Sequence, residues 1–176
     1  MRFKPLTRGD ELAVSIWPHY RGYYKRLDYA LRPETGWIKT YCENSKCKKY
    51  GGYVEDKLIG FTLLVFQNPK PNSRRRMAEF FVAVHPKMLG RGFGWQLGVQ
   101  TLRKAFNVLH LDEVFLRVRN DHDWGIENYP KLGFKETSPG RLVEEVVNGK
   151  RVSFRIMTLT KERYQKHPSS GKTDVT

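Results

Sequence analysis

One stretch of the chain limits its folding more than any other: a β-rich apolar run, three glycines, then a helical run. Residues 78–84, AEFFVAV, are apolar on both faces, which is typical of a buried central strand. Residues 94–110 carry a helical stripe, made of Leu97, Thr101, Leu102, Ala105, Phe106 and Leu109. A further strand is predicted at residues 112–118. Strand, glycine loop, helix and strand form one crossover unit, so part of the sheet is predicted to be parallel.

The remaining apolar runs predict an antiparallel sheet around that unit. In the first half they indicate a strand at 2–7, a helix at 11–17 capped by Thr7 or Asp10, and a hairpin at 50–67 that turns at 55–57. In the second half they indicate a helical segment at 124–133 and strands at 134–138 and 151–159. An Asn-Gly turn at 147–150 is expected to join these two strands. Tyr24, Leu27 and Leu31 have helical spacing, and we interpret them as core. The predicted fold class is α/β, a mixed, mostly antiparallel sheet with one central crossover and flanking helices. We expect one domain over residues 1–163 and a polar, disordered tail over 164–176.

Composition restricts the class of protein. The longest apolar run, Leu58 to Phe66, is shorter than the ~20 residues of a membrane helix. The N-terminus shows no apolar signal segment, so a cytoplasmic protein is expected. Two cysteines, Cys42 and Cys47, are too few for a zinc site. A disulfide between them is possible in geometry but uncommon in a cytosolic protein, so we expect two reduced, structural thiols. The formal net charge of +14 favours anionic ligands: a phosphorylated cofactor, an acidic substrate or nucleic acid.

The three glycines have a physical use. The first N–H groups of a helix lack internal partners and carry partial positive charge, so they bind anions. Glycine lets the backbone approach a phosphate without a Cβ in the way. Arg91 adds a charge-assisted donor. The spacing fits neither a nucleotide P-loop nor a dinucleotide fingerprint.

Residues 84–97, VHPKMLGRGFGWQL, resemble the acetyl-CoA motif of the GNAT superfamily of N-acetyltransferases. In that family a strand ends in Val-x-Pro and a glycine loop opens a helix. The residues in register are Val84, Pro86, Gly90, Arg91, Gly92 and Gly94. The resemblance implies that loop amides wrap the pyrophosphate of coenzyme A, namely those of Leu89, Gly90, Arg91, Gly92, Phe93 and Gly94. It further implies that Val82 and Val84 pair through their backbone with the pantetheine arm. Leu89 replaces the usual Gln or Arg, so only its amide can serve.

Residues 116–134, LRVRNDHDWGIENYPKLGF, resemble the family's second motif, with Val118, Tyr129, Gly133 and Phe134 in register. The resemblance implies that His122 and Gly125 lie at the cofactor, where the family usually has Asn and Ala. Gly125 is expected to leave room for the pantetheine arm. Pro130 predicts a short, kinked or restarted helix. The resemblance covers roughly Arg2 to Thr160.

Two residues are predicted to be catalytic. The resemblance implies that Glu79, the acid on the central strand, acts as the general base, and that Tyr129 protonates the departing thiolate. A backbone N–H near Ala83 would polarise the thioester carbonyl. Glu79 could instead face solvent or pair with Arg75 or Arg76. His85 and His122 are alternative bases, and His122 could also be a polar contact or a helix cap.

The sequence therefore predicts an N-acetyltransferase that moves an acetyl group from acetyl-CoA to a primary amine, without a metal. The alternative is a non-catalytic coenzyme A or nucleic-acid binding module on the same fold. Two features support this alternative: the three arginines at residues 74–76 and the net charge. The acceptor, a small molecule or peptide, is left open. The positive charge favours an anionic acceptor over a polycationic one. The oligomeric state is open too, including a homodimer.

Overall fold

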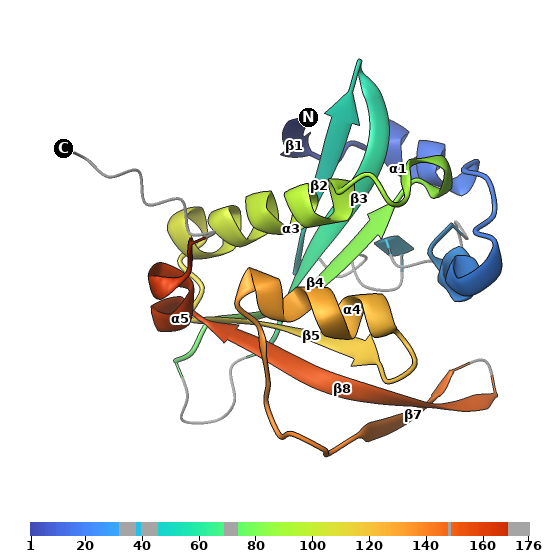
Figure 1. Ribbon diagram of the computed structural model, residues 1–176. Coiled ribbons are helices and arrows are strands. Elements are labelled where there is room, and N and C mark those ends of the chain that lie inside the picture. The colour runs from blue at the N-terminus through green and yellow to red at the C-terminus, as the bar shows by residue number, and fades with distance from the viewer. Residues whose placement is uncertain (32–37, 40–45, 69–73, 148, 169–176) are drawn as a thin grey trace. The chain divides into compact units, whose positions relative to one another are not determined.

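The computed structural model describes residues 1–31, 38–39, 46–68, 74–147 and 149–168. The chain divides into two compact units. Unit 1 comprises residues 1–67 and 80–101, and unit 2 comprises residues 68–79 and 102–176. Strand β4 (Met77–Val84) and helix α3 (Phe93–Arg103), both labelled in Figure 1, each have residues in both units.

The strands of unit 1 follow the order β1 (Arg2–Pro5), β2 (Cys47–Val54), β3 (Lys57–Phe66) and the last five residues of β4. Strands β1, β2 and β3 pair antiparallel. The predicted hairpin is confirmed, and its turn is tighter than expected. Glu55 and Asp56 alone form it, both with positive φ, 48° and 61°. Two central residues with positive φ match the right-handed twist of the flanking strands.

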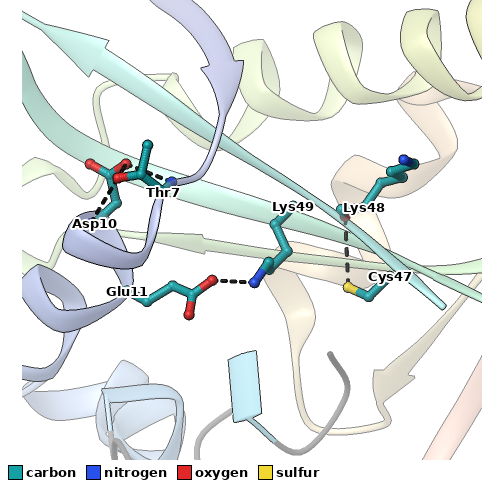
Figure 2. A network of polar contacts seen from close by, with 6 residues as sticks. All are labelled: Thr7, Asp10, Glu11, Cys47, Lys48 and Lys49. Carbon is teal, nitrogen blue, oxygen red and sulfur yellow. Dashed lines mark hydrogen bonds and ion pairs between the residues drawn. The ribbon is translucent and has the colours of Figure 1, made fainter. Parts of the chain in front are cut away.

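Helix α1 (Arg8–Ser15) is capped by Thr7, one of the two predicted caps. The Thr7 hydroxyl accepts a hydrogen bond from the Asp10 amide, and the Asp10 carboxylate accepts one from the Thr7 amide (Figure 2). Such a reciprocal cap satisfies two amides at the start of a helix and is worth about 1 kcal/mol. On the same helix, Glu11 forms an ion pair with Lys49 of β2, which ties α1 to the sheet of unit 1 (Figure 2).

The aromatic segment of unit 1 is core, as expected. A 3₁₀-helix covers Gly22–Leu31, and Leu31 is buried. Tyr24 and Leu27 pack against the same apolar cluster. The cluster contains Leu6, Val14, Trp17, Tyr20, Leu31, Phe61, Leu63 and Ala83.

Helix α3 lies close against the sheet of unit 1 because two strand positions are glycine. A Cβ built on Gly52 of β2 would lie 2.8 Å from a Leu97 methyl, and one on Gly60 of β3 would lie 2.6 Å from the other methyl. Both distances are shorter than real Cβ contacts. One turn later, the buried hydroxyls of Thr62 and Thr101 lie 2.7 Å apart. These contacts fix the helix that follows the glycine loop.

The strands of unit 2 follow the order β4, β5 (Glu113–Arg119), β8 (Lys150–Thr160) and β6 (Lys135–Glu136), with β7 (Val143–Val147) also on β8. The first three residues of β4 pair parallel with β5, which confirms the crossover. The pairs β5–β8, β6–β8 and β7–β8 are antiparallel. The mixed, mostly antiparallel sheet is therefore confirmed.

The helical segments of unit 2 lie between its strands in the chain or follow the last strand. After α3 the chain widens into a π-helix over Lys104–Val108, in which the Leu109 amide donates to the Lys104 carbonyl, five residues back, at 2.9 Å. Helix α4 (Asp123–Asn128) gives way to a 3₁₀-helix over Tyr129–Leu132. The change falls directly before Pro130, where a break was predicted, because proline has no N–H for the α-helical ladder.

Two elements of unit 2 are absent from the prediction. Strand β7 forms the hairpin with β8, so the expected direct connection of residues 134–138 to 151–159 by that turn is wrong. Asn148 of the turn lies outside the described residues. Helix α5 (Lys161–Lys166) runs past residue 164, where the tail was expected to begin, and buries Tyr164 beside Phe106 with ring centroids 4.6 Å apart. Residues 169–176 lie outside the described part.

The expectation of a free thiol is wrong for Cys47, which is disulfide-bonded in the structure. Cys42 lies outside the described residues. None of the helices in the described part of the chain is both long and apolar enough to cross a membrane.

Candidate functional site

The loop between β4 and α3 is built as the sequence predicts. Strand β4 ends at Val84, His85 caps the next segment, and Pro86–Met88 form one 3₁₀ turn. Gly90 and Gly92 then take positive φ values of 74° and 76°. A non-glycine residue is strained in this region of φ, so glycine is required at both positions.

The space above these two glycines is open. A Cβ built on Gly90 or on Gly92 would meet no atom within 4 Å in the described structure. Arg91 between them is exposed. The Leu89 side chain packs against the core of unit 1, so it cannot extend over the loop. The loop therefore presents backbone and one cation on an open surface.

Helix α3 contributes further donors. Its first internal hydrogen bond runs from the Gln96 amide to the Gly92 carbonyl at 3.1 Å. The amides of Phe93 and Gly94 precede that bond and have no partner inside the helix. Gly94 lies within the first turn of α3. A loop of positive-φ glycines that opens a helix can bind an anion such as a phosphate through several amides at once.

The end of β4 presents backbone groups on the side away from β3. The His85 amide donates to the Ile59 carbonyl of β3 at 2.8 Å. Successive residues of a strand direct their backbone groups to opposite sides, so those of Val84 face away from β3. The buried Tyr20 hydroxyl donates to the Val84 carbonyl at 2.7 Å. The Val84 carbonyl, expected to pair with a pantetheine arm, thus already accepts one hydrogen bond.

Glu79 belongs to unit 2 and is buried, with 5% of its surface exposed. Its partner is Arg117 of β5, which donates from Nε to Glu79 Oε1 at 2.6 Å. The same guanidinium donates to Glu145 of β7 at 2.5 Å. Arg75, offered by the sequence as a partner for Glu79, instead lies 3.5 Å from a Glu113 oxygen. One arginine is therefore shared by two carboxylates.

The environment of Glu79 acts on its pKa in opposite directions. Burial raises the pKa, Arg117 lowers it, and the negative charge of Glu145 raises it, with a net increase. Burial is the largest cause. A raised carboxyl pKa favours the acceptance of a proton at near-neutral pH.

Tyr129 begins the 3₁₀-helix after α4, and burial raises its pKa to about 12. Its ring lies edge-on to Trp124 and to Phe134, with centroids 6.3 Å and 6.0 Å away. A phenol with this pKa stays protonated at neutral pH and can donate a hydrogen bond or a proton.

His122 and Gly125 lie at the start of α4, within unit 2. Gly125 leaves no open room, because the side chains of Val118, His122 and Tyr129 fill the space where its Cβ would lie. His122 precedes α4 at the N-cap position, but its side chain makes no capping hydrogen bond to that helix. The structure thus brings His122, Gly125 and Tyr129 into one cluster within unit 2.

His85, an alternative base, has other contacts in unit 1. Its Nδ1 accepts a hydrogen bond from the Lys87 amide at 3.1 Å, and its ring packs edge-on against Trp17. Burial lowers its pKa. Within the described residues, no group of three His, Cys, Asp or Glu side chains could hold a metal ion.

The chain is similar in sequence to spermidine N(1)-acetyltransferases. It is 31% identical to the one from Vibrio cholerae over 115 residues, which is 63% of this chain and 63% of that protein. It is 29% identical to the one from Escherichia coli K12 over 104 residues, which is 58% of this chain and 55% of that protein. The match thus spans less than two thirds of the length of either relative.

Solved structures of the Vibrio cholerae enzyme share the fold. A spermidine N-acetyltransferase in complex with CoA and spermine has a TM-score of 0.65 at 21% identity, covering 93% of this chain and 97% of that chain. A chimera of the Vibrio cholerae enzyme with hSSAT has a TM-score of 0.71 at 22% identity, covering 95% and 100%. The profile of the Acetyltransferase (GNAT) family matches residues 10–134, well over half of the sequence, and the chain therefore belongs to that family.

Proposed function

We propose that this chain is an acetyl-CoA-dependent N-acetyltransferase that acetylates a primary amine. The observation that carries the proposal is the loop of unit 1. Gly90 and Gly92 have positive φ and open space above them, and the loop leads directly into α3. A family protein with this loop has the donors that a pyrophosphate needs.

The loop residues fit the proposed ligand. The amides of Leu89, Gly90, Arg91, Gly92, Phe93 and Gly94 would hold the pyrophosphate, and the Arg91 guanidinium would add charge. The Val82 and Val84 backbone faces away from β3 and would hold the pantetheine arm. When bound, acetyl-CoA supplies the acetyl group as an activated thioester.

The acceptor amine must lose a proton to react. A lysine-like amine has a pKa of about 10.4, so presenting it neutral at pH 7 costs about 4.6 kcal/mol. Glu79 is the proposed base, because its carboxyl pKa is raised and a raised pKa strengthens a base. Its small exposure and its contact with Arg117 favour proton transfer through a bridging water.

Tyr129 is the proposed acid for the coenzyme thiolate. With a pKa of about 12 its hydroxyl is protonated across the assay range. A free thiol has a pKa of about 8.5, so the thiolate can also leave without full protonation. The hydroxyl is therefore expected to accelerate the reaction without being essential.

Two observations point to different acceptors. The relatives are named spermidine N(1)-acetyltransferases, which supports a polyamine. The net charge of +14 on this chain repels polycations and favours an amine that carries an anionic group. Both classes belong in the first assay.

The test measures thiol release from acetyl-CoA with an amine panel. The panel contains spermidine, spermine, free amino acids and peptides with neutral or acidic N-terminal segments. We expect release that depends on one class of amine and is lost in the Gly92→Asp variant. Acetyl-CoA binding without release for any amine would support the non-catalytic module instead. Retention on heparin that falls with rising salt would then distinguish a nucleic-acid binder.

A further inference from the structure

Position 125 of α4 favours glycine because neighbouring side chains occupy the space of a Cβ atom. It lies within a regular helix, where any residue can adopt the backbone conformation. A Cβ built on it would lie 2.5 Å from His122 Cδ2, 2.8 Å from Val118 Cγ2 and 3.0 Å from Tyr129 Cε2. Cβ contacts shorter than 3.0 Å essentially do not occur, so an alanine at this position must displace a neighbour.

The three neighbours differ in their freedom to move. Val118 is β-branched, buried on β5, and paired in register with Arg155 of β8, so it is fixed. Tyr129 is held on its other sides by Trp124 and Phe134. His122 lies outside the regular part of the helix and is only partly buried.

The rings of His122 and Tyr129 are therefore neighbours across the space that a Gly125 Cβ would occupy. Both rings approach the same point above Gly125, and both lie edge-on to Trp124, with interplanar angles of 87° and 79°. The absent Cβ of Gly125 makes space for the His122 ring. A smaller side chain at position 122 would leave a gap beside Tyr129.

We infer that His122 and Gly125 act together as positioning residues that hold the Tyr129 ring in the orientation its hydroxyl needs. The inference rests on the proposed role of Tyr129 as the acid. His122 and Gly125 stand where the family usually has Asn and Ala. The geometry implies that the two differences from the family compensate for each other, because the larger ring at 122 uses the space of the methyl group missing at 125.

The first test is a double-mutant cycle with His122→Asn and Gly125→Ala. Gly125→Ala alone should lower kcat about tenfold, within the range of coupling between contacting residues, and leave the KM for acetyl-CoA nearly unchanged. His122→Asn alone should lower kcat severalfold because the Tyr129 ring loses one side of its support. The double variant should recover most of the loss, since the new methyl group fills the space of the ring. Gly9→Ala is the matched control: its Cβ would meet only Thr7 Oγ1, at 3.8 Å.

The second test does not depend on activity. The ring signal of Tyr129 is followed by NMR in protein with ¹³C-labelled tyrosine and is identified by its loss in Tyr129→Phe. It should shift in each single variant and return towards the wild-type position in the double variant. If wild type acetylates no amine, the proposed function fails, while this signal still tests the positioning.

Two outcomes would overturn the inference. The first is additivity of the two substitutions, both in kcat and in the NMR shift. The second is an unchanged Tyr129 signal in His122→Asn. If Gly125→Ala fails to fold, His122→Asn and the double variant decide, because the double variant must then fold and carry a near-native Tyr129 signal.

Discussion

The guanidinium of Arg117 holds the buried carboxylate of Glu79 at two points, with Nε donating to Oε1 at 2.6 Å and Nη2 lying 3.4 Å from Oε2. Its Nη1 donates to Glu145 Oε1. The cluster thus holds two negative charges and one positive charge. The protonation of Glu79 depends on both partners.

Glu145→Gln should lower the pKa of Glu79. The charge of Glu145 raises that pKa, and its removal leaves Arg117 to stabilise the Glu79 carboxylate alone. If Glu79 is the base, the acid limb of the pH profile of kcat/KM should move to lower pH. The measurement is that profile with the best amine of the panel.

Glu144→Gln is the matched control for this experiment. Glu144 neighbours Glu145 on β7, is exposed, and pairs with Arg151 at 3.6 Å. Its removal should leave the acid limb in place. Equal shifts in the two variants, or no shift in Glu145→Gln, would remove Glu79 from the role of base.

Arg117→Met should destabilise the fold by about 3–5 kcal/mol, because Glu79 would remain as a buried carboxylate without its cation. Its folded-state pKa would rise further above the unfolded value of about 4.3. A raised folded-state pKa means that the folded protein binds the proton more tightly. The loss of stability should therefore be small below the unfolded pKa and grow as the pH rises through the folded one.

Denaturant unfolding at about pH 4, below the unfolded pKa, and at about pH 8 measures this effect. The double variant Glu79→Gln with Arg117→Met removes both charges and should recover most of the stability at pH 8. A loss that is the same at both pH values, or is not recovered in the double variant, would contradict the ion-pair account.

Gly92→Asp should abolish acetyl-CoA binding while the fold survives. The side chain would enter open space above the loop, bring a negative charge to the proposed pyrophosphate site and strain a residue with φ of 76°. Isothermal titration calorimetry with acetyl-CoA measures the affinity.

Gly140→Asp is its control. Gly140 has a similar φ of 79° and equally open surroundings, but lies in the turn between β6 and β7. It should lose a comparable amount of stability and keep its affinity. Affinity that is unchanged in Gly92→Asp would remove the pyrophosphate from this loop.

Tyr129→Phe should lower kcat about tenfold to a hundredfold and leave the KM for acetyl-CoA nearly unchanged. The phenylalanine ring keeps the contacts with Trp124 and Phe134, so only the hydroxyl is lost. Steady-state kinetics with acetyl-CoA and the best amine measure both constants. A wild-type kcat would make Tyr129 a packing residue.

Sequence reasoning succeeded where a local pattern determines the structure. The β4–loop–α3 crossover follows from the change of apolar periodicity across the glycines, and the break at Pro130 follows from the missing N–H. Strand β7 was missed because Glu144 and Glu145 interrupt its apolar alternation. Helix α5 was missed because it is short and polar. Thr160, which caps it, and the single buried Tyr164 were the available signals.

The partners of the candidate catalytic residues could not be predicted, since they depend on long-range register. Glu79 pairs in register with Phe115 of β5, and Arg117 follows two residues later on the same face. The sequence offered arginines close by in the chain instead. Likewise, only the packing around Gly125 shows that His122 occupies the space of the missing methyl group.

The central claim is tested most directly by incubating the wild-type chain with ¹³C-acetyl-CoA and the amine panel, followed by mass spectrometry of the amines. The account predicts that labelled acetyl appears on a primary amine in wild type, and that the label is absent with Gly92→Asp. Labelled acetate without any acetylated amine, or no label transfer although wild type binds acetyl-CoA, would contradict it.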